Sequence, residues 1–407
     1  MARPKKKREF PKHLRGMKYF PHLEKFVAHL HSHHDHPNRQ LHFDQYLAML
    51  LLAFFNPAIE SLRDLVLLSQ TPLANRNLGF HFTSLTSVSD ASRLFDPEPL
   101  RRIFLELSEA ASALDGPRRP TSMPPELKIL AADASFWKLL PRMTKELYAG
   151  PRTRAPKGQL KGFFVYDVER AVPVDAEFKL DKSSEGVALL KQLQPGAIYL
   201  LDRGYRAFNL FEGIVGVGSS LVARLSENYK YTLKSKRELS EADRNAGVIS
   251  DEGVQLGAKE NRMETPMRIV QARIVSPPPK NLDPKHKRGK HSGYPKDQPL
   301  VQEWILVTNR MDLDAAAVVQ LYQYRWEIEI FFRWFKCVLE CKHLFAESEN
   351  GMQLQFYAAL IATVLVVLYT GRKPNKRLWK VIQFYFQGWC DIDFVNEQLE
   401  FAKLTAK

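Results

Sequence analysis

The spacing of apolar and polar positions changes near residue 125, and this change separates two kinds of predicted element. Before it, apolar residues recur with helical spacing between tight breaks such as Asn56-Pro57 and Asp96-Pro97, which predicts a block of short helices. Such a block suits a helix-turn-helix-like domain, and a small bundle without a DNA role has the same pattern. The expected helical stretches are 43–55, 59–68, one starting near 87, one starting at 94, and 100–114.

After residue 125, short apolar runs predict strands mixed with helices, which indicates the α/β or α+β class. A polar stretch from about 230 to 300 contains β-like pieces such as 267–275 and a loop over 277–299. A strand at 304–307 then leads into one long helix from Asp314 to about Leu344. The earlier expected elements are a strand 127–136, a hairpin 163–168 and 171–178, a helix 187–193, a strand 197–201, a helix 208–217 and a strand 220–225.

The chain of 407 residues carries a formal net charge of +14, with a sequence pI of about 9.5. Such an excess opposes folding through self-repulsion, so it indicates a polyanionic partner. Nucleic acid is the first candidate and an anionic membrane surface the second. The apolar run at 356–370 falls short of the roughly 20 residues that span a bilayer, so we expect a buried core helix there.

Cysteines and histidines change the picture little. Three cysteines in so long a chain do not suit a disulfide framework and indicate a reducing, cytoplasmic compartment. Cys337 and Cys341 have no second pair nearby, which favours a structural role over a zinc site. The charges at the N-terminus are not followed by an apolar stretch, so we expect no signal peptide. A run of histidines has irregular spacing, which favours a solvent-facing loop; it comprises His29, His31, His33, His34 and His36.

Two aspartates stand where an acid is costly. Asp133 lies inside a predicted apolar strand, and Asp202 directly follows the apolar run 198–201. A carboxylate at a buried strand or strand end must be hydrogen-bonded, paired with a cation or bound to a metal. A lone aspartate of this kind is more often a hydrogen-bonded cap, but two of them with an acid on a following helix favour a functional site.

The long predicted helix supplies that acid. On a helical wheel, Tyr322, Arg325, Glu329 and Lys336 share one narrow face. Charges that lie beside an apolar stripe, rather than opposite it, indicate a cleft. The apolar stripe, which we expect to be buried, comprises Leu321, Ile328, Phe331, Phe332, Phe335 and Leu339.

Four motifs together resemble a known family. Asp133 stands in DASFW, Asp202 stands in LLDRGY, and the strand Leu306-Val-Thr-Asn309 precedes the long helix. The helix itself has the spacing Tyr322-x2-Arg325-x3-Glu329-x6-Lys336. In this order the motifs resemble those of bacterial insertion-sequence transposases of the "IS four" group, over about residues 125–370. The helix spacing matches the Tyr-Arg-Glu-Lys signature of that group, and each aspartate motif alone is weak.

The resemblance implies a fold and a division into domains. It implies a ribonuclease-H-like catalytic core, in which the central sheet holds the two aspartates and a later helix supplies the glutamate. Residues 121–370 would form this catalytic domain, interrupted by a β-rich insertion at about 230–300. Residues 1–120 would form a basic arm and a helical, DNA-binding domain, and residues 371–407 a C-terminal helical tail.

The resemblance also implies roles for individual residues. Asp133, Asp202 and Glu329 would be the catalytic residues and the metal ligands. Three carboxylates without a histidine or cysteine cluster select hard divalent cations, Mg²⁺ or Mn²⁺, and two such ions would clamp the phosphate that is cut. The expected DNA-binding residues are Tyr322, Arg325, Lys336, Arg203 and Trp304.

The expected activity is metal-dependent cleavage and joining of transposon ends by a cut-and-paste route with hairpin-ended DNA. The expected partners are the terminal inverted repeats and target DNA, bound by a homodimer in the bacterial cytoplasm and at the nucleoid, and no membrane. Three alternatives remain open on the sequence. They are a purely hydrolytic nuclease of the same fold, a domesticated DNA-binding protein without activity, and a protein of the membrane surface.

Overall fold

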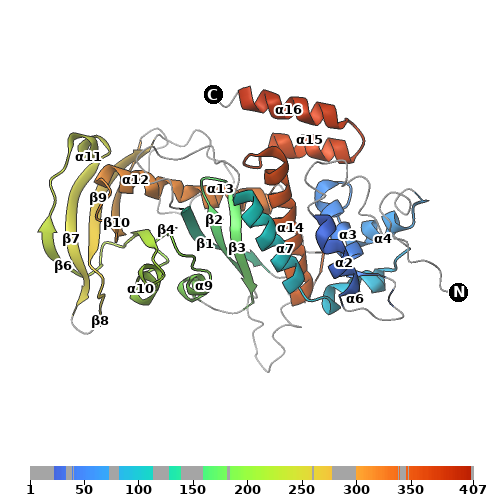
Figure 1. Ribbon diagram of the computed structural model, residues 1–407, viewed down its shortest axis with the longest axis horizontal. Helices are drawn as coiled ribbons and strands as arrows, with labels where there is room; N and C mark the ends of the chain where they lie inside the picture. Colours follow the sequence, from blue (N-terminus) through green and yellow to red (C-terminus); the bar gives the residue numbers. More distant parts are fainter. Residues whose placement is uncertain are drawn as a thin grey trace, which may run out of the picture. The chain divides into compact units, whose positions relative to one another are not determined.

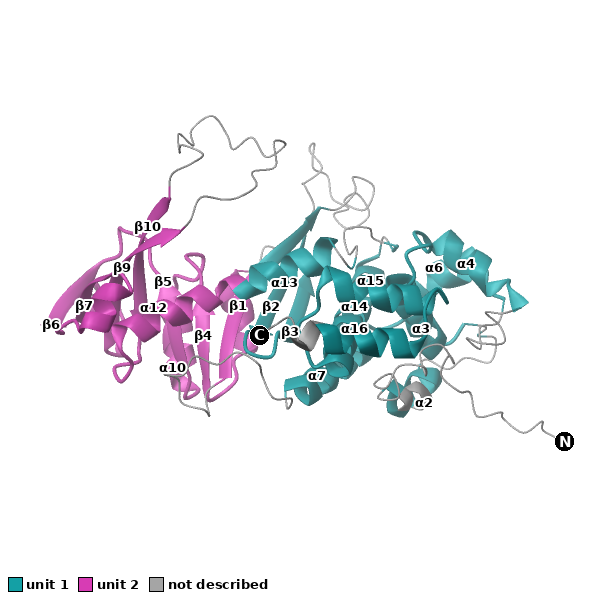
Figure 2. Ribbon diagram, turned by 90° about the horizontal axis from the view of Figure 1, so that it is seen from above, with its two compact units in different colours: residues 1–119, 134–182, 327–407 teal, residues 120–133, 183–326 magenta. Residues whose placement is uncertain are grey.

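The computed structural model describes two compact units. It describes residues 23–33, 39, 41–72, 82–112, 128–138, 159–180, 184–258, 261–276, 299–337, 339, 345–346 and 348–404. Unit 1 comprises Met1–Arg119, Ala134–Lys182 and Glu327–Lys407, and unit 2 comprises Pro120–Asp133 and Ser183–Trp326; Figure 2 colours them separately. The domain boundaries expected at 120 and 370 stay predictions.

Unit 2 is built on a mixed sheet with the strand order β1-β4-β5-β10-β9-β7-β6 (Figure 1). β1 (Lys128–Lys138), β4 (Ala197–Leu201) and β5 (Ser220–Arg224) are parallel, and β10 (Leu300–Thr308) pairs antiparallel with β5. Parallel strands need crossover connections. These are α9 (Glu185–Lys191), which precedes β4, and α10 (Phe208–Gly216), which precedes β5. The five residues of β4 are all buried, as is typical of a strand in the middle of such a sheet.

The first five strands carry the expected fold class. β1 contributes residues to both units and has β2 (Gln159–Asp167) as its other neighbour, and β2 pairs antiparallel with β3 (Val172–Lys179). Numbered along the chain, the order is therefore 3-2-1-4-5, with strands 1, 4 and 5 parallel. This is the arrangement of a ribonuclease-H-like core, so the predicted class is confirmed.

The polar stretch after β5 forms the β-rich insertion that the sequence predicts. It contains β6 (Tyr231–Lys236), α11 (Glu241–Asn245), β7 (Val248–Ala258), β8 (Asn261–Arg262) and β9 (Met267–Ser276). β9 pairs with β10 over nine residue pairs from Leu300↔Ser276 to Thr308↔Arg268, so the insertion extends the sheet of unit 2 rather than forming a separate sheet. The loop expected at 277–299 lies outside the described residues up to 298.

Unit 1 is organised around one long apolar helix, α14 (Glu349–Thr370), which is buried along nearly its whole length. It packs against α3 (Phe43–Phe55), α6 (Leu85–Leu94), α7 (Glu98–Ser112) and β3. Glycine at 371 ends the helix in the left-handed conformation with φ 61°. By length and composition α14 could cross a membrane, but 94% of its apolar window is buried within the protein, as expected for a core helix.

Aromatic side chains fill the space between the strands and helices of unit 1. The Phe356 ring lies 4.6 Å from Trp137 and 4.9 Å from Phe178, measured between centroids. Phe335 of α13 (Trp326–Cys337) approaches Phe164 of β2 at 5.9 Å, edge to face. The apolar stripe predicted on the long helix is buried throughout, as expected.

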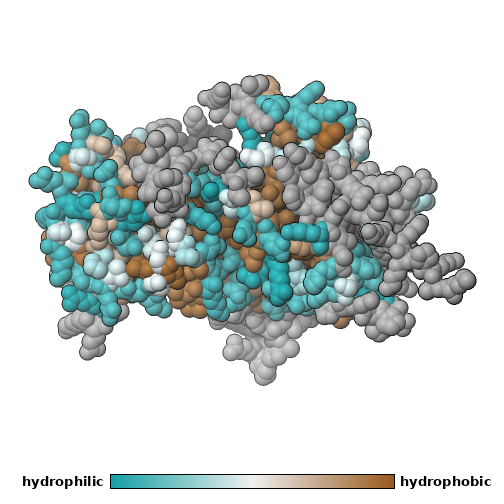
Figure 3. Space-filling view, in the orientation of Figure 1, coloured by the Kyte–Doolittle hydropathy of each residue, from teal (hydrophilic) through white to brown (hydrophobic). Residues whose placement is uncertain are grey.

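The C-terminal helices leave large apolar side chains in solvent. α15 (Lys376–Phe386) and α16 (Ile392–Leu404) expose Phe384, Phe394 and Phe401 by 41–49%, and Trp389 between them by 79%. In Figure 3 hydrophobic atoms accordingly reach the surface among hydrophilic ones near these helices. α2 (Glu24–Ser32) and α4 (Leu62–Ser69) complete the described helices of unit 1.

The structure corrects three expectations from the sequence. The long helix expected from Asp314 to about Leu344 is two helices, α12 (Ala315–Tyr324) and α13, with a turn at Arg325, and α13 ends at Cys337. Leu94 ends α6 instead of starting a helix, because α6 begins at Leu85 with Ser84 as its N-cap.

The third correction concerns the histidines, because His29 and His31 lie on α2 and not in a solvent-facing loop. The His31 ring stacks on His42 at 4.0 Å between centroids, and its Nδ1 lies 3.0 Å from the buried carboxylate of Asp44. These partners are a residue of α3 and the residue that caps it. His34, His36, the basic arm at residues 1–18 and Cys341 lie outside the described residues.

Candidate active site

Adjacent parallel strands place Asp133 and Asp202 next to each other in unit 2. The register of β1 and β4 ends at Ala132↔Leu201, so the next residue on each strand is one of the two aspartates. Neighbouring strands lie roughly 4.8 Å apart, and residues in register point to the same face of a sheet. Both carboxylates are partly exposed. The structure therefore brings together the two aspartates that the sequence singled out.

The turn after β4 is shaped by Asp202 and glycine. Asp202 accepts a hydrogen bond from the Gly204 amide at 2.7 Å. A Cβ on residue 204 would lie 2.9 Å from the Asp202 carboxylate and 3.1 Å from that of Glu185. Any side chain larger than that of glycine would therefore displace both carboxylates. Burial raises the pKa of Tyr205, and the negative charges of Asp133, Glu185 and Asp202 raise it further. Glu185 is thus a third acid near the two aspartates. No sequence motif indicated its presence there.

Three arginines converge near Asp202 and the end of α12. Burial lowers the pKa of Arg224, and the positive charges of Arg203 and Arg325 lower it further. The Arg325 guanidinium lies 5.8 Å from the centre of the Tyr322 ring. Burial raises the pKa of Tyr322. The positive charges of Arg325 and Arg224 lower this pKa and the negative charge of Asp202 raises it, so that it remains above its usual value. Since like charges repel, such a cluster is stabilised when an anion binds to it.

Arg224 was missed by the sequence analysis. It ends the strand β5 and lies opposite Leu306 of β10, so only the sheet register brings it to Tyr322. Its Nη2 donates to the carbonyl of Glu303 at 3.1 Å, and Nε is buried with no hydrogen-bond partner in the described structure. Because a buried guanidinium N–H without an acceptor is costly, this group is suited to an incoming oxygen ligand.

Trp304 lies in the same part of unit 2. It stands on β10 opposite Ala272 of β9, before the residues of β10 that pair with β5. Its ring meets Tyr322 edge to face at 5.0 Å and carries the Arg224 guanidinium 5.7 Å from its centre. Nε1 donates to Gln302 at 3.1 Å, and the side chain is only half-buried.

The other two signature residues lie on α13. Glu329 is half-buried there. Lys336 donates to the carbonyl of Phe136 at 2.9 Å, and its ammonium lies 4.7 Å from the centre of the Trp137 ring. Both contacts reach the C-terminal part of β1, within unit 1. Tyr322 and Arg325 belong to unit 2, and Glu329 and Lys336 to unit 1, so the joining of Glu329 to the aspartates stays a prediction.

Comparison with known families identifies the chain. A family model described as the transposase DDE domain matches residues 124–365, which is more than half of the chain. The chain belongs to this family. The match begins just before β1 and ends within α14, so it contains every residue of the candidate active site.

Individual relatives of this transposase family member agree with the assignment. It is 27% identical over 176 residues to y4zB of Sinorhizobium fredii, described as a transposase, covering 43% of each chain. It is 26% identical over 235 residues to a protein of Geobacillus stearothermophilus described as the transposase for insertion sequence element IS5377, covering 56% of this chain and 55% of that one. The chain thus spans about half the length of these relatives.

A solved structure gives a weaker likeness. The piggyBac transposase, in a cryo-EM structure of its synaptic complex with hairpin DNA, has a TM-score of 0.41 and 11% identity to this chain. The alignment covers 96% of this chain and 82% of that one.

The transposase family depends on divalent metal ions, and the described side chains meet this requirement in part. Among the residues that the structure describes, no group of three His, Cys, Asp or Glu side chains is arranged to hold a metal ion. Asp133 and Asp202 offer carboxylate oxygens from adjacent strands, which is the donor type that Mg²⁺ and Mn²⁺ prefer. The donor set therefore fits a hard divalent cation.

Proposed function

We propose that this protein is a DNA transposase that cleaves the ends of a transposable element and joins them to target DNA. The observation that carries the proposal is the placement of Asp133 and Asp202 at adjacent parallel strands beside Arg203, Arg224 and Arg325. Carboxylates suit metal ions, and the arginines suit phosphate oxygens. A phosphodiester held between the two groups would be oriented for attack.

Asp133 and Asp202, with Glu329 as the third acid, would hold Mg²⁺ or Mn²⁺. Held by these carboxylates, two such ions would supply the positive charge for activation of an attacking water or 3′-hydroxyl and for stabilisation of the leaving oxygen. Arg325 is suited to a bidentate contact with phosphate, and Tyr322 to a single hydrogen bond. Lys336 would hold a further backbone phosphate, as a point charge.

The route we propose is cut-and-paste transposition through hairpin-ended DNA. The partners would be terminal inverted repeats and target DNA, held by a homodimer in which each copy contributes one site. We propose a cytoplasmic location, with the protein at the nucleoid when bound to DNA. This rests on the family, on the net charge of +14, and on the burial of α14 within unit 1.

Strand joining distinguishes this function from its rivals. We expect the protein with Mg²⁺ to cut an oligonucleotide that carries the element's end and to link the new 3′-end to a second duplex. The joined product would appear as a longer labelled strand on a denaturing gel, and it should be missing with Asp202→Ala. Cleavage without any joined product would identify a hydrolytic nuclease. Binding without cleavage would identify a DNA-binding protein that has lost its activity.

Salt dependence tests the contact between Arg224 and phosphate. Each phosphate contact on duplex DNA contributes about −0.9 to the slope of log binding constant against log salt concentration. We therefore expect Arg224→Gln and Lys336→Ala each to reduce the slope by about one in a fluorescence titration. Arg273→Gln is the matched control, because Arg273 is exposed on β9 of the same sheet and pairs with Glu303 at 3.0 Å. An unchanged slope for Arg224→Gln would remove this residue from the phosphate site.

A further inference from the structure

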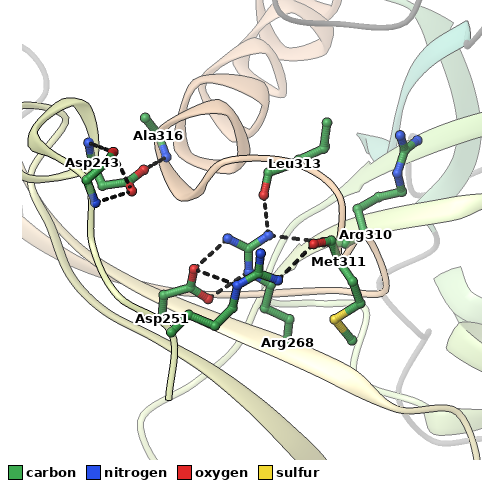
Figure 4. A network of polar contacts seen from close by, with 9 residues as sticks. Asp243, Asp251, Arg268, Arg310, Met311, Leu313 and Ala316 are labelled. Atoms are coloured by element: carbon green, nitrogen blue, oxygen red, sulfur yellow. Dashed lines mark hydrogen bonds and ion pairs between the residues drawn. The ribbon is translucent and has the colours of Figure 1, made fainter. Parts of the chain in front are cut away.

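The segment between β10 and α12 is held by side chains of the β-rich insertion. Figure 4 shows Arg268, Asp251 and Asp243 around the backbone of residues 310–316. Arg268 on β9 donates through Nη1 to the carbonyl of Arg310 at 3.2 Å and to that of Leu313. Every group involved belongs to unit 2.

A second arginine and an aspartate also form hydrogen bonds with the backbone of residues 310–316. Arg237, just after β6, donates to the carbonyl of Met311 at 2.8 Å. Asp243 of α11 accepts the Ala316 amide, in the first turn of α12, at 2.8 Å, and it also accepts the amide and hydroxyl of Ser240. One carboxylate thus satisfies amides at the starts of two helices. Although burial raises the pKa of Asp243, the hydrogen bonds from Ser240 and Ala316 and the charge of Arg268 lower it overall, so the group is a carboxylate at neutral pH.

The centre of the network is a buried ion pair that stability alone does not explain. Arg268 is 1% exposed and binds Asp251, 4% exposed, through Nε at 2.7 Å and Nη2 at 2.6 Å. Buried ion pairs often stabilise a fold no more than apolar residues of the same size would. What such a pair adds is directional hydrogen bonding, because the planar guanidinium fixes the positions of the groups that it binds. Here those groups are the carbonyls that precede α12.

The position of α12 determines the position of two site residues. Tyr322 and Arg325 lie about 9 Å and 14 Å beyond Ala316 along the axis, at roughly 1.5 Å per residue. A tilt of about 5° at the start of α12 would therefore move Arg325 by about 1 Å, and an error of that size can reduce a rate by about a hundredfold. Apolar packing of α12 on the sheet is not directional, whereas the hydrogen bonds to residues 310–316 are.

We propose that Arg268, Asp251, Asp243 and Arg237 are positioning residues, through which the β-rich insertion sets the angle of α12 and places Tyr322 and Arg325 for phosphate binding. The proposal rests on the function proposed above. It gives the insertion a role within the active site of its own chain, in addition to any surface that it offers to DNA. The set of four is called the α12 clamp below.

The main test replaces the ion pair of the α12 clamp by apolar residues of similar size. In Asp251→Leu/Arg268→Met no buried charge is left without a partner, so we expect the full chain to remain folded by urea denaturation. The carbonyls of Arg310 and Leu313 lose their donor. We expect cleavage at saturating DNA to fall about 10- to 100-fold, while the dissociation constant for DNA changes less than about threefold.

Two milder changes keep the test valid if the double variant does not fold. Asp243→Asn retains an oxygen acceptor for the Ala316 amide and should cleave nearly normally, whereas Asp243→Ala should show the reduced rate. Arg237→Gln removes the contact to Met311 and the ion pair with Asp251 at 3.6 Å, and it should reduce the rate severalfold. Arg273→Gln, on the same strand as Arg268 but exposed, is the matched control and should be without effect.

Hydrogen exchange separates failure of the clamp from failure of the proposed site. Peptides covering residues 310–320 should exchange faster in the double variant, and peptides covering β4 should not. Unchanged exchange at 310–320, or faster exchange with a normal cleavage rate, overturns the clamp. If the loss of cleavage is no larger than the fraction of the variant that is unfolded, the clamp hypothesis is also overturned. If Asp202→Ala still cleaves, the proposed active site fails, but the exchange data still decide whether the clamp holds α12.

Discussion

Alanine at Asp133, Asp202 or Glu329 is expected to reduce strand cleavage by about a thousandfold or more and to leave DNA binding nearly unchanged. Removing a metal ligand removes several kcal/mol of stabilisation of the transition state, and about 4 kcal/mol corresponds to a thousandfold in rate. Binding should persist because carboxylates repel phosphate, and the positive side chains remain. Cleavage of a labelled transposon end in Mg²⁺ and a gel-shift titration measure the two quantities.

The control for Glu329 is Glu327→Gln on the same helix. Glu327 pairs with Lys373 within unit 1, so its loss can lower stability but should spare the rate of the folded protein. Thermal unfolding of each variant separates the two effects. Near-normal cleavage by any one of the three alanine variants would exclude that residue from the metal site. This outcome matters most for Glu329, since the aspartates are already adjacent through the register of β1 and β4.

Trp304→Ala is expected to nick the first strand at a nearly normal rate and to form hairpins about 10- to 100-fold more slowly. A tight hairpin strains the DNA end, and turning a base out of the duplex relieves the strain. An aromatic plane can hold such a base with about 1–3 kcal/mol. The half-buried ring beside Arg224 and Tyr322 is suited to this role, because the neighbouring groups suit the phosphates on either side. Quantifying nicked and hairpin products over time measures both steps.

Three comparisons decide what Trp304 does. Trp304→Phe retains an aromatic plane and should form hairpins nearly normally, and Trp389→Ala, at a tryptophan that is 79% exposed in unit 1, should have no effect. A DNA end lacking the extruded base should partly rescue Trp304→Ala. If Trp304→Ala instead lowers the melting temperature sharply and slows both steps equally, Trp304 is a packing residue of β10 and the stacking hypothesis is wrong.

The sequence predicted well those elements whose apolar pattern is set locally. Strands such as 197–201 and 220–225, and the hairpin around Glu169-Arg170, agree with the structure because alternating or continuous apolar runs determine which faces can be buried. Asp133 and Asp202 stood out because each interrupts or ends such a run. Their adjacency follows from parallel pairing in register, which the family resemblance implied.

What the sequence did not predict depends on contacts between distant segments. The turn at Arg325 contains no proline or glycine that would mark it in the sequence, and the apolar stripe continues on both sides of it. A helical wheel drawn from the sequence therefore showed one helix where the structure has two. Arg224 and Glu185 reach the site through sheet register and the turn at Gly204, over separations that no motif spans. His31 is half-buried because its partners His42 and Asp44 come from another helix.

The burial of α14 has a consequence for how the chain is made. A free segment of this length and apolarity would resemble a membrane span to a ribosome-bound targeting system. Its principal partners α3, α6 and α7 all precede it in the chain, so during synthesis they have already left the ribosome when α14 emerges. The helices α3, α6 and α7 can therefore cover the apolar surface of α14 as soon as it emerges.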